Sequence, residues 1–165
     1  MKIKELKNNK EKVCGEILRS LPKWFGSENS ILEYCRDVKD MPCFVAQEND
    51  LNVGFVAIKN HFKSSAEIYV LGIKENYHRK GIGKKLINLI ETTLINQGTE
   101  FLTVKTLSPT RENAEYAKTR KFYLSLGFKP IEEFKTLWGK ENPCLFMAKH
   151  LWSNIVMPHH EFRFF

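Results

Sequence analysis

The chain has 165 residues, a formal net charge of +7 and 42% hydrophobic residues. This length suits one domain with a buried core and is short for two. No apolar run approaches the roughly 20 residues of a membrane span, and the N-terminal stretch MKIKELKNNKEK has no apolar signal core. We therefore expect a cytoplasmic protein with no membrane partner.

The pattern of apolar and turn-forming residues predicts ten elements. In chain order they are two helices, three strands, a helix, a strand, a helix and two strands, over residues 9–21, 28–38, 43–48, 53–59, 66–73, 81–97, 101–107, 112–126, 128–134 and 144–151. The turn NDLN joins the first two strands as a hairpin. This order predicts a single mixed α/β domain of the α+β type over residues 1–150, followed by a C-terminal tail over residues 151–165.

The distribution of charged residues and cysteines argues against nucleic-acid binding, metal binding and a disulfide framework. The lysines are spread along the chain, and no long Lys/Arg run marks a nucleic-acid patch, so a DNA or RNA partner is disfavoured. A positive chain still suits an anionic ligand. The four cysteines form no CxxC pair and no zinc-ligand spacing. We therefore expect no metal, and reduced thiols rather than a disulfide framework.

The stretch RKGIGK, residues 79–84, places two glycines between a predicted strand and a predicted helix. Glycine costs a helix about 1 kcal/mol relative to alanine, so the pair needs a reason. Unpaired N–H groups at a helix start attract anions, and glycine lets phosphate approach the backbone. The stretch therefore suits a pyrophosphate site, although an ordinary tight turn explains it equally well. It matches neither a P-loop nor a Rossmann fingerprint, which needs a third glycine where Leu86 stands.

Two segments resemble motifs of the GNAT superfamily of N-acetyltransferases. VLGIKENYHRKGIGKKLI is similar to the acetyl-CoA-binding signature Gln/Arg-x-x-Gly-x-Gly/Ala, with His78 in place of Gln or Arg. KFYLSLGFKPIEEF is similar to a helix ending Tyr-x-x-x-Gly-Phe before a strand, and Tyr123 begins that motif. The two motifs occur in the family's order, and the resemblance covers about residues 41–148.

The resemblance implies a GNAT-like domain whose central sheet is mixed, mostly antiparallel and flanked by helices. It also implies acetyl-CoA as co-substrate and acetyl transfer to a primary amine by direct attack in a ternary complex. The acceptor would be a small-molecule amine or a peptide or protein amine. The rival interpretation is a catalytically silent acyl-CoA-binding domain that acts as a sensor. A homodimer is left open.

The family's cofactor contacts carry over to specific positions. The pantetheine arm would pair with the backbone of an opened strand edge, and the pyrophosphate would lie on the glycine turn. The expected cofactor-binding residues are Leu71, Gly72, Ile73, Arg79, Lys80, Gly81, Ile82, Gly83, Lys84 and Asn113. Asn113 stands in for an asparagine that the family has before its second helix. Gly72 is either a bulge that opens the edge or a small residue in a crowded strand.

Two residues are the expected catalytic groups. An amine with a pKa of about 10.4 is almost wholly protonated at pH 7, so a general base is useful. Glu67 in AEIYVLGI resembles the base of the histone-acetylating branch, and strand alternation puts it on one face with Tyr69, Leu71 and Ile73. A solvated strand-end glutamate is the alternative. The motif position of Tyr123 implies the acid that protonates the leaving thiolate, and a core tyrosine is the alternative.

The acceptor end is less defined. Aromatic and acidic residues in the first interhelical segment and the last hairpin could hold a cationic amine, although structural roles explain them too. These residues are Trp24, Phe25, Glu132, Glu133 and Trp138.

Overall fold

The structure is a computed structural model that describes residues 1–151. The expected tail over residues 151–165 lies outside this range except for Leu151. Leu151 is buried, and its N–H donates to the Glu100 carbonyl at 2.7 Å. The packed domain therefore includes residue 151.

The described chain folds into four α-helices and seven strands. In order these are β1 (Lys2–Glu5), α1 (Lys10–Arg19), α2 (Glu28–Asp37), β2 (Cys43–Glu48), β3 (Leu51–Phe62), β4 (Ser65–Ile73), α3 (Ile82–Asn96), β5 (Phe101–Leu107), α4 (Ala114–Ser125), β6 (Lys129–Phe134) and β7 (Cys144–His150). Every predicted helix and strand is present, with ends shifted by a few residues. β1 was not predicted, because the sequence KIKE of this edge strand has only one apolar residue.

The strands form one sheet in the order β1-β2-β3-β4-β5-β7-β6. All neighbours are antiparallel except β4 and β5, which confirms the mixed, mostly antiparallel sheet. The β2–β3 hairpin turns on Asn49 and Asp50, whose φ angles of 48° and 63° fit a two-residue type I′ turn. This tight turn makes β3 begin two residues earlier than the predicted NDLN loop allows.

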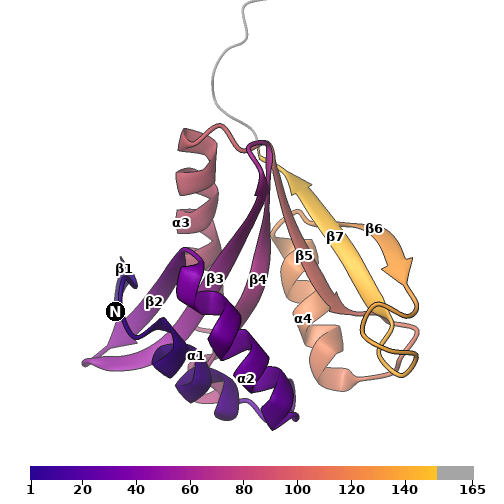
Figure 1. The fold of residues 1–165 in the computed structure, drawn as a ribbon, viewed down its shortest axis with the longest axis horizontal. Helices are drawn as coiled ribbons and strands as arrows, with labels where there is room; N and C mark the ends of the chain where they lie inside the picture. Colours follow the sequence, from indigo (N-terminus) through magenta and orange to yellow (C-terminus); the bar gives the residue numbers. More distant parts are fainter. Residues whose placement is uncertain (152–165) are drawn as a thin grey trace, which may run out of the picture.

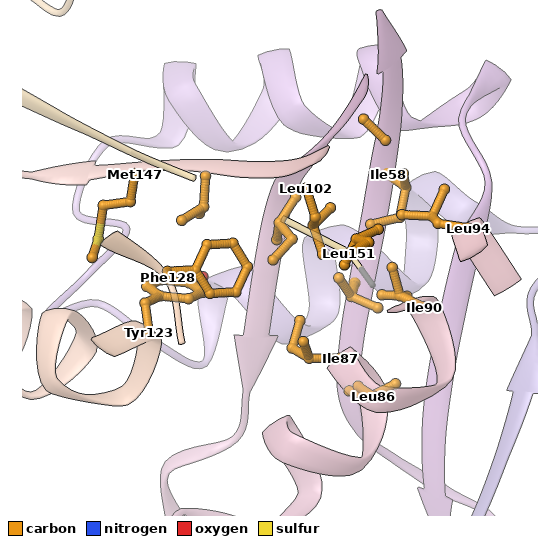
Figure 2. Close-up of a cluster of buried hydrophobic side chains, with 14 of the residues drawn as sticks. Ile58, Leu86, Ile87, Ile90, Leu94, Leu102, Tyr123, Phe128, Met147 and Leu151 are labelled. Atoms are coloured by element: carbon orange, nitrogen blue, oxygen red, sulfur yellow. The ribbon is translucent and has the colours of Figure 1, made fainter. Parts of the chain in front are cut away.

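Hydrophobic cores lie on both faces of the sheet. On one face, Leu86, Ile90 and Leu94 of α3 pack toward Ile58 and Leu102 (Figure 2). On the other face, α1 packs against β3 and β4 in a separate cluster that includes Ile17, Leu18, Phe55 and Val70. Burying each such side chain is worth about 1.5–3 kcal/mol. The helices are therefore held to the sheet on both sides.

The sheet opens between its two parallel strands. Only Ser65–Ile68 of β4 pair with β5, through Phe101–Val104. Beyond this point the two strands diverge, as Figure 1 shows. One wing holds β1–β4 with α1, α2 and α3, and the other holds β5, β7 and β6 with α4. The splayed strand edge that the resemblance implies is thus part of the fold.

Candidate functional site

A groove of about 1940 Å³ lies where β4 and β5 separate. It is lined by the free part of β4, the start of α3, the end of β5, α4 and the segment between α1 and α2. The predicted site residues all line it except Lys80. The Nζ of Lys80 instead lies 4.7 Å from the centre of the Tyr77 ring.

The first turn of α3 has no side-chain cap and no acidic residue. Gly81 is its N-cap, with φ 77°, and no side chain caps the helix. The N–H groups of the first turn have no intrahelical partner. Helix starts usually attract Asp or Glu, but this first turn has no acidic residue and contains Lys84 and Lys85. These features favour the interpretation as an anion site over the interpretation as an ordinary tight turn.

The two glycines of this turn have different physical reasons. Gly81 needs its left-handed φ, and a Cβ there would meet nothing within 4 Å. A Cβ on Gly83 would come within 3.0 Å of Cζ of Phe122 on α4. Gly83 therefore allows the close packing of α3 on α4, and a bulky residue there would disturb this contact before any ligand is considered.

β4 contains a bulge that changes which side of the sheet its side chains face. Val70 pairs with Ala57 and Ile68 pairs with Ile58, so Tyr69 is an extra residue. Before the bulge, Ile68 faces the α3 side. After it, Leu71 and Ile73 face the α3 side, whereas Tyr69 and Val70 pack toward α1 and α2. The prediction that Glu67 shares a face with Leu71 and Ile73 was therefore wrong.

Gly72 is not the bulge. It pairs regularly with Phe55, and a Cβ on it would come within 2.8 Å of Ile17 in α1. Its role is the alternative one, a small residue in a crowded strand.

Glu67 lies one residue before the last β4 residue that pairs with β5. Its side chain is only 7% exposed, so it is not a solvated strand end. Lys105 Nζ on β5 lies 2.8 Å from Oε1, and His61 Nε2 on β3 lies 2.6 Å from Oε2. Both carboxylate oxygens thus have partners that sequence reasoning missed, because each comes from a neighbouring strand.

Tyr123 lies at the base of the groove on α4. Its ring packs against Phe122 and Phe128, with ring centres 5.3 and 5.5 Å away. Figure 2 shows it beside Phe128 in the core. Burial raises the pKa of Tyr123 above its ordinary value. Tyr123 is protonated at neutral pH, as an ordinary tyrosine with a pKa of about 10 also is.

Thr106 is a groove residue that sequence reasoning missed. It lies on β5, two residues beyond the last residue paired with β4, and is 3% exposed. Among residues 1–151, its Oγ1 is the one buried side-chain nitrogen or oxygen without a hydrogen-bond partner. Such a group costs about 1–3 kcal/mol. An orphaned hydroxyl in a groove fits a ligand that supplies the missing hydrogen bond.

The segment between α1 and α2 connects the two wings. Trp24 Nε1 donates to Thr119 Oγ1 at 3.1 Å, and the Tyr116 hydroxyl donates to the Trp24 carbonyl at 2.9 Å. The Trp24 ring also meets the edge of His78, whose Nε2 lies 2.6 Å from the Ile73 carbonyl. The histidine that departs from the family motif thus ties the glycine loop to β4.

Asn113 has a structural task. Its Oδ1 accepts from the Tyr116 N–H at 2.9 Å and caps α4. Of the five acceptor candidates, Trp24, Phe25 and Trp138 line the groove, whereas Glu132 and Glu133 do not. Glu133 accepts from the hydroxyls of Ser108 and Thr110 instead, and the Ser108 hydroxyl is the main cause of its lowered pKa.

Residues 1–151 contain no group of three or more His, Cys, Asp or Glu that could hold a metal ion. This range also contains no helix that is long and apolar enough to cross a membrane. The four cysteines are free thiols.

The diverging parallel strands and the glycine-opened helix define a known class of fold. A model of the acetyltransferase (GNAT) domain family matches residues 39–130, more than half of the chain. The chain therefore belongs to the GNAT acetyltransferase family.

Individual relatives are more distant. A protein of Chlorobaculum tepidum named Uncharacterized N-acetyltransferase CT2212 is 30% identical over 107 residues, which cover 65% of this chain and 59% of that protein. The match thus spans less than two thirds of that relative's length.

Solved structures share the fold at lower identity. An aminoglycoside 6'-N-acetyltransferase complexed with coenzyme A has a TM-score of 0.75 and 20% identity, covering 93% of this chain and 99% of that one. The ribosomal-protein-S18-alanine N-acetyltransferase of Escherichia coli has a TM-score of 0.71 and 17% identity, covering 95% and 98%. These two proteins are named for very different acceptors, so the shared fold does not identify the acceptor of this chain.

Proposed function

We propose that this protein transfers the acetyl group of acetyl-CoA to a primary amine, by direct attack in a ternary complex. The observation that carries the proposal is the divergence of β4 and β5. It opens one groove that contains Glu67, Tyr123 and the uncapped start of α3.

The groove fits coenzyme A in four ways. The first turn of α3 offers unpaired N–H groups and two lysines to the pyrophosphate. Beyond Ile68, β4 has no strand paired with it on the side of β5, so this edge can pair with the amides of the pantetheine arm. Thr106 Oγ1 lacks a partner that this arm can supply. The lining contains more Lys and Arg residues than Glu residues, as a phosphorylated ligand requires.

Two residues take the chemical roles. Glu67 is the buried carboxylate next to the point where β4 and β5 diverge. Glu67 and the side chains bonded to it deprotonate the acceptor ammonium. Tyr123 donates its proton to the leaving thiolate, which has a pKa near that of cysteine, about 8.5. None of the cysteines belongs to a motif for an acyl-enzyme intermediate, so direct attack is favoured.

The acceptor is an amine with few positive charges. Near Glu67 the groove is lined by Lys59 and Lys105, and Lys105 already neutralises Glu67. A polycation bound beside Glu67 would be repelled by these two lysines. Trp24, Phe25 and Trp138 offer apolar contact instead, which suits a monoamine or a peptide N-terminus.

The test is a screen for acetyl-CoA-dependent thiol release. The panel contains tyramine, a short peptide with a free N-terminus, spermidine and kanamycin, with acetyl-CoA alone as the blank. We expect turnover with tyramine or the peptide. Binding of acetyl-CoA without transfer to any amine would favour the silent acyl-CoA-binding alternative.

A further inference from the structure

A histidine outside both sequence motifs lies against the proposed catalytic carboxylate. We propose that His61 is the residue that receives the proton of the acceptor ammonium, and that Glu67 is its positioning partner. This inference rests on the proposed acetyl transfer and assigns its deprotonation step to a specific atom.

The contacts of Glu67 leave it poorly placed to accept a proton itself. Lys105 is hydrogen-bonded to Oε1 of Glu67, and His61 is hydrogen-bonded to Oε2. A separation of 2.6 Å between His61 Nε2 and Oε2 requires a proton between them, because two lone pairs would repel each other. With Glu67 ionised, that proton belongs to Nε2. The other ring nitrogen, Nδ1, then has a free lone pair, as in other carboxylate–histidine pairs.

His61 reaches this position because β3 is irregular. Asn60 pairs with Ala66 and Phe62 pairs with Ser65, so His61 is an extra residue in a bulge. Bulges re-aim side chains and are over-represented next to active sites. The side chain of His61 lines the groove and is 36% exposed. It can therefore both contact an acceptor and return a proton to solvent, whereas Glu67 is buried.

Charged and neutral groups from several elements surround this pair. The charged neighbours include Lys105 on β5, Lys59 opposite Glu67 on β3, and Asp37 of α2, which accepts from the Tyr69 hydroxyl at 2.6 Å. Glu33 of α2 also lines the groove. The nearby acids Tyr34, Tyr69 and Cys144 stay neutral at physiological pH, since burial raises the pKa of each. Lys105 pairs directly with Glu67, and the positive charge that forms on His61 during the reaction lies against the Glu67 carboxylate, with Nε2 2.6 Å from Oε2.

One proton leaves the acceptor for His61 in each acetyl transfer. The acceptor enters as R–NH₃⁺ and gives one proton to His61 Nδ1, directly or through one water. The freed lone pair attacks the thioester carbon and forms the C–N bond. The C–S bond then breaks, the thiolate takes the proton of Tyr123, and the second nitrogen proton restores Tyr123. The imidazolium releases its proton to solvent, leaving an amide, a thiol and one proton.

The kinetic test compares His61→Asn, His61→Ala and the matched control His150→Asn, which changes the last residue of β7, a histidine outside the groove lining. The assay uses the amine of the panel above that wild type acetylates fastest. We expect His61→Asn to lower kcat about 10²-fold at pH 7, with acetyl-CoA affinity within twofold. The loss should shrink toward pH 9.5, where more amine arrives neutral. Added imidazole should restore about tenfold to His61→Ala. His150→Asn should behave as wild type.

A second readout needs no acceptor. The ¹⁵N chemical shifts of the imidazole rings at pH 8, assigned by loss of a signal in His61→Asn, should show His61 protonated on Nε2 and bare on Nδ1. The Nδ1–H tautomer, or a full rate for His61→Asn at pH 7, would overturn the inference. If the loss in kcat is equal at every pH and imidazole restores nothing, His61 is only structural. A wild-type protein that acetylates no amine would instead overturn the proposed function, a result that leaves the tautomer measurement unaffected.

Discussion

The substitution Thr106→Val tests whether the groove is shaped for a ligand that bonds to the Thr106 hydroxyl. Valine has nearly the shape of threonine and replaces the hydroxyl with a methyl group. In the free protein the Thr106 hydroxyl is buried without a partner, which costs about 1–3 kcal/mol. Removing it should raise the free energy of unfolding by about 1 kcal/mol. For a chain of this size that corresponds to a Tm increase of about 2–4 °C.

The same substitution should weaken acetyl-CoA binding. A hydrogen bond from the cofactor to Thr106 is worth about 0.5–1.5 kcal/mol, and the cofactor atom would lose its partner in the variant. A cost near 1.4 kcal/mol corresponds to about a tenfold higher Kd. The signature is thus a free protein that melts later but gains less stability from acetyl-CoA.

Thr103→Val is the matched control on the same strand. Thr103 Oγ1 donates to the Ala66 carbonyl at 3.3 Å in the paired part of β5. Its loss should lower the free energy of unfolding by about 0.5–1.5 kcal/mol and leave the acetyl-CoA Kd unchanged. Urea denaturation and isothermal calorimetry measure both quantities. If Thr106→Val destabilises the free protein and binds acetyl-CoA like wild type, the hydroxyl has no ligand role.

Three further predictions concern the residues around the groove. Tyr123→Phe should lower kcat about 10²–10⁴-fold with little change in acetyl-CoA affinity, and an unchanged kcat in steady-state assays would make the residue purely core. Lys105→Met removes a partner of buried Glu67 and should lower the free energy of unfolding by about 2 kcal/mol. The control Lys118→Met breaks a surface pair and should lower it by less than about 0.5 kcal/mol. Equal losses for the two variants in urea denaturation would refute this difference. Burial raises the pKa of Tyr34 to about 12 and also raises that of Tyr123. The hydroxyls of both tyrosines therefore lose their protons at lower pH in the unfolded chain than in the folded protein. The free energy of unfolding should be constant below pH 10 and fall by about 1 kcal/mol per tyrosine by pH 11. A constant urea midpoint from pH 9 to pH 11 would contradict the two raised pKa values.

Local patterns in the sequence were sufficient to predict the architecture and one end of the site. Helical and strand periodicities located every element except β1, and the glycine turn after β4 lies at the start of α3 as expected. These features depend on residues that are close in the chain. The match of both motifs to the family similarly required only short segments.

The catalytic end could not be predicted in the same way, because it depends on how strands meet. AEIYVLGI is apolar on both faces, so its alternation hides the bulge at Tyr69. His61 and Lys105 reach Glu67 from the two neighbouring strands. The hydroxyl of Thr106 is orphaned because β5 leaves β4 two residues earlier. None of these relations has a signature in a single stretch of residues.

Calorimetric titration of acetyl-CoA into the wild-type protein, repeated as a thermal shift, tests the central claim most directly. The claim is that the groove between β4 and β5, which is lined in part by the start of α3, is a coenzyme site. We predict saturable binding of one acetyl-CoA per chain, with a stabilisation of about 2.7 kcal/mol at 100 times the Kd. An absence of both binding heat and thermal shift at millimolar acetyl-CoA would contradict the claim.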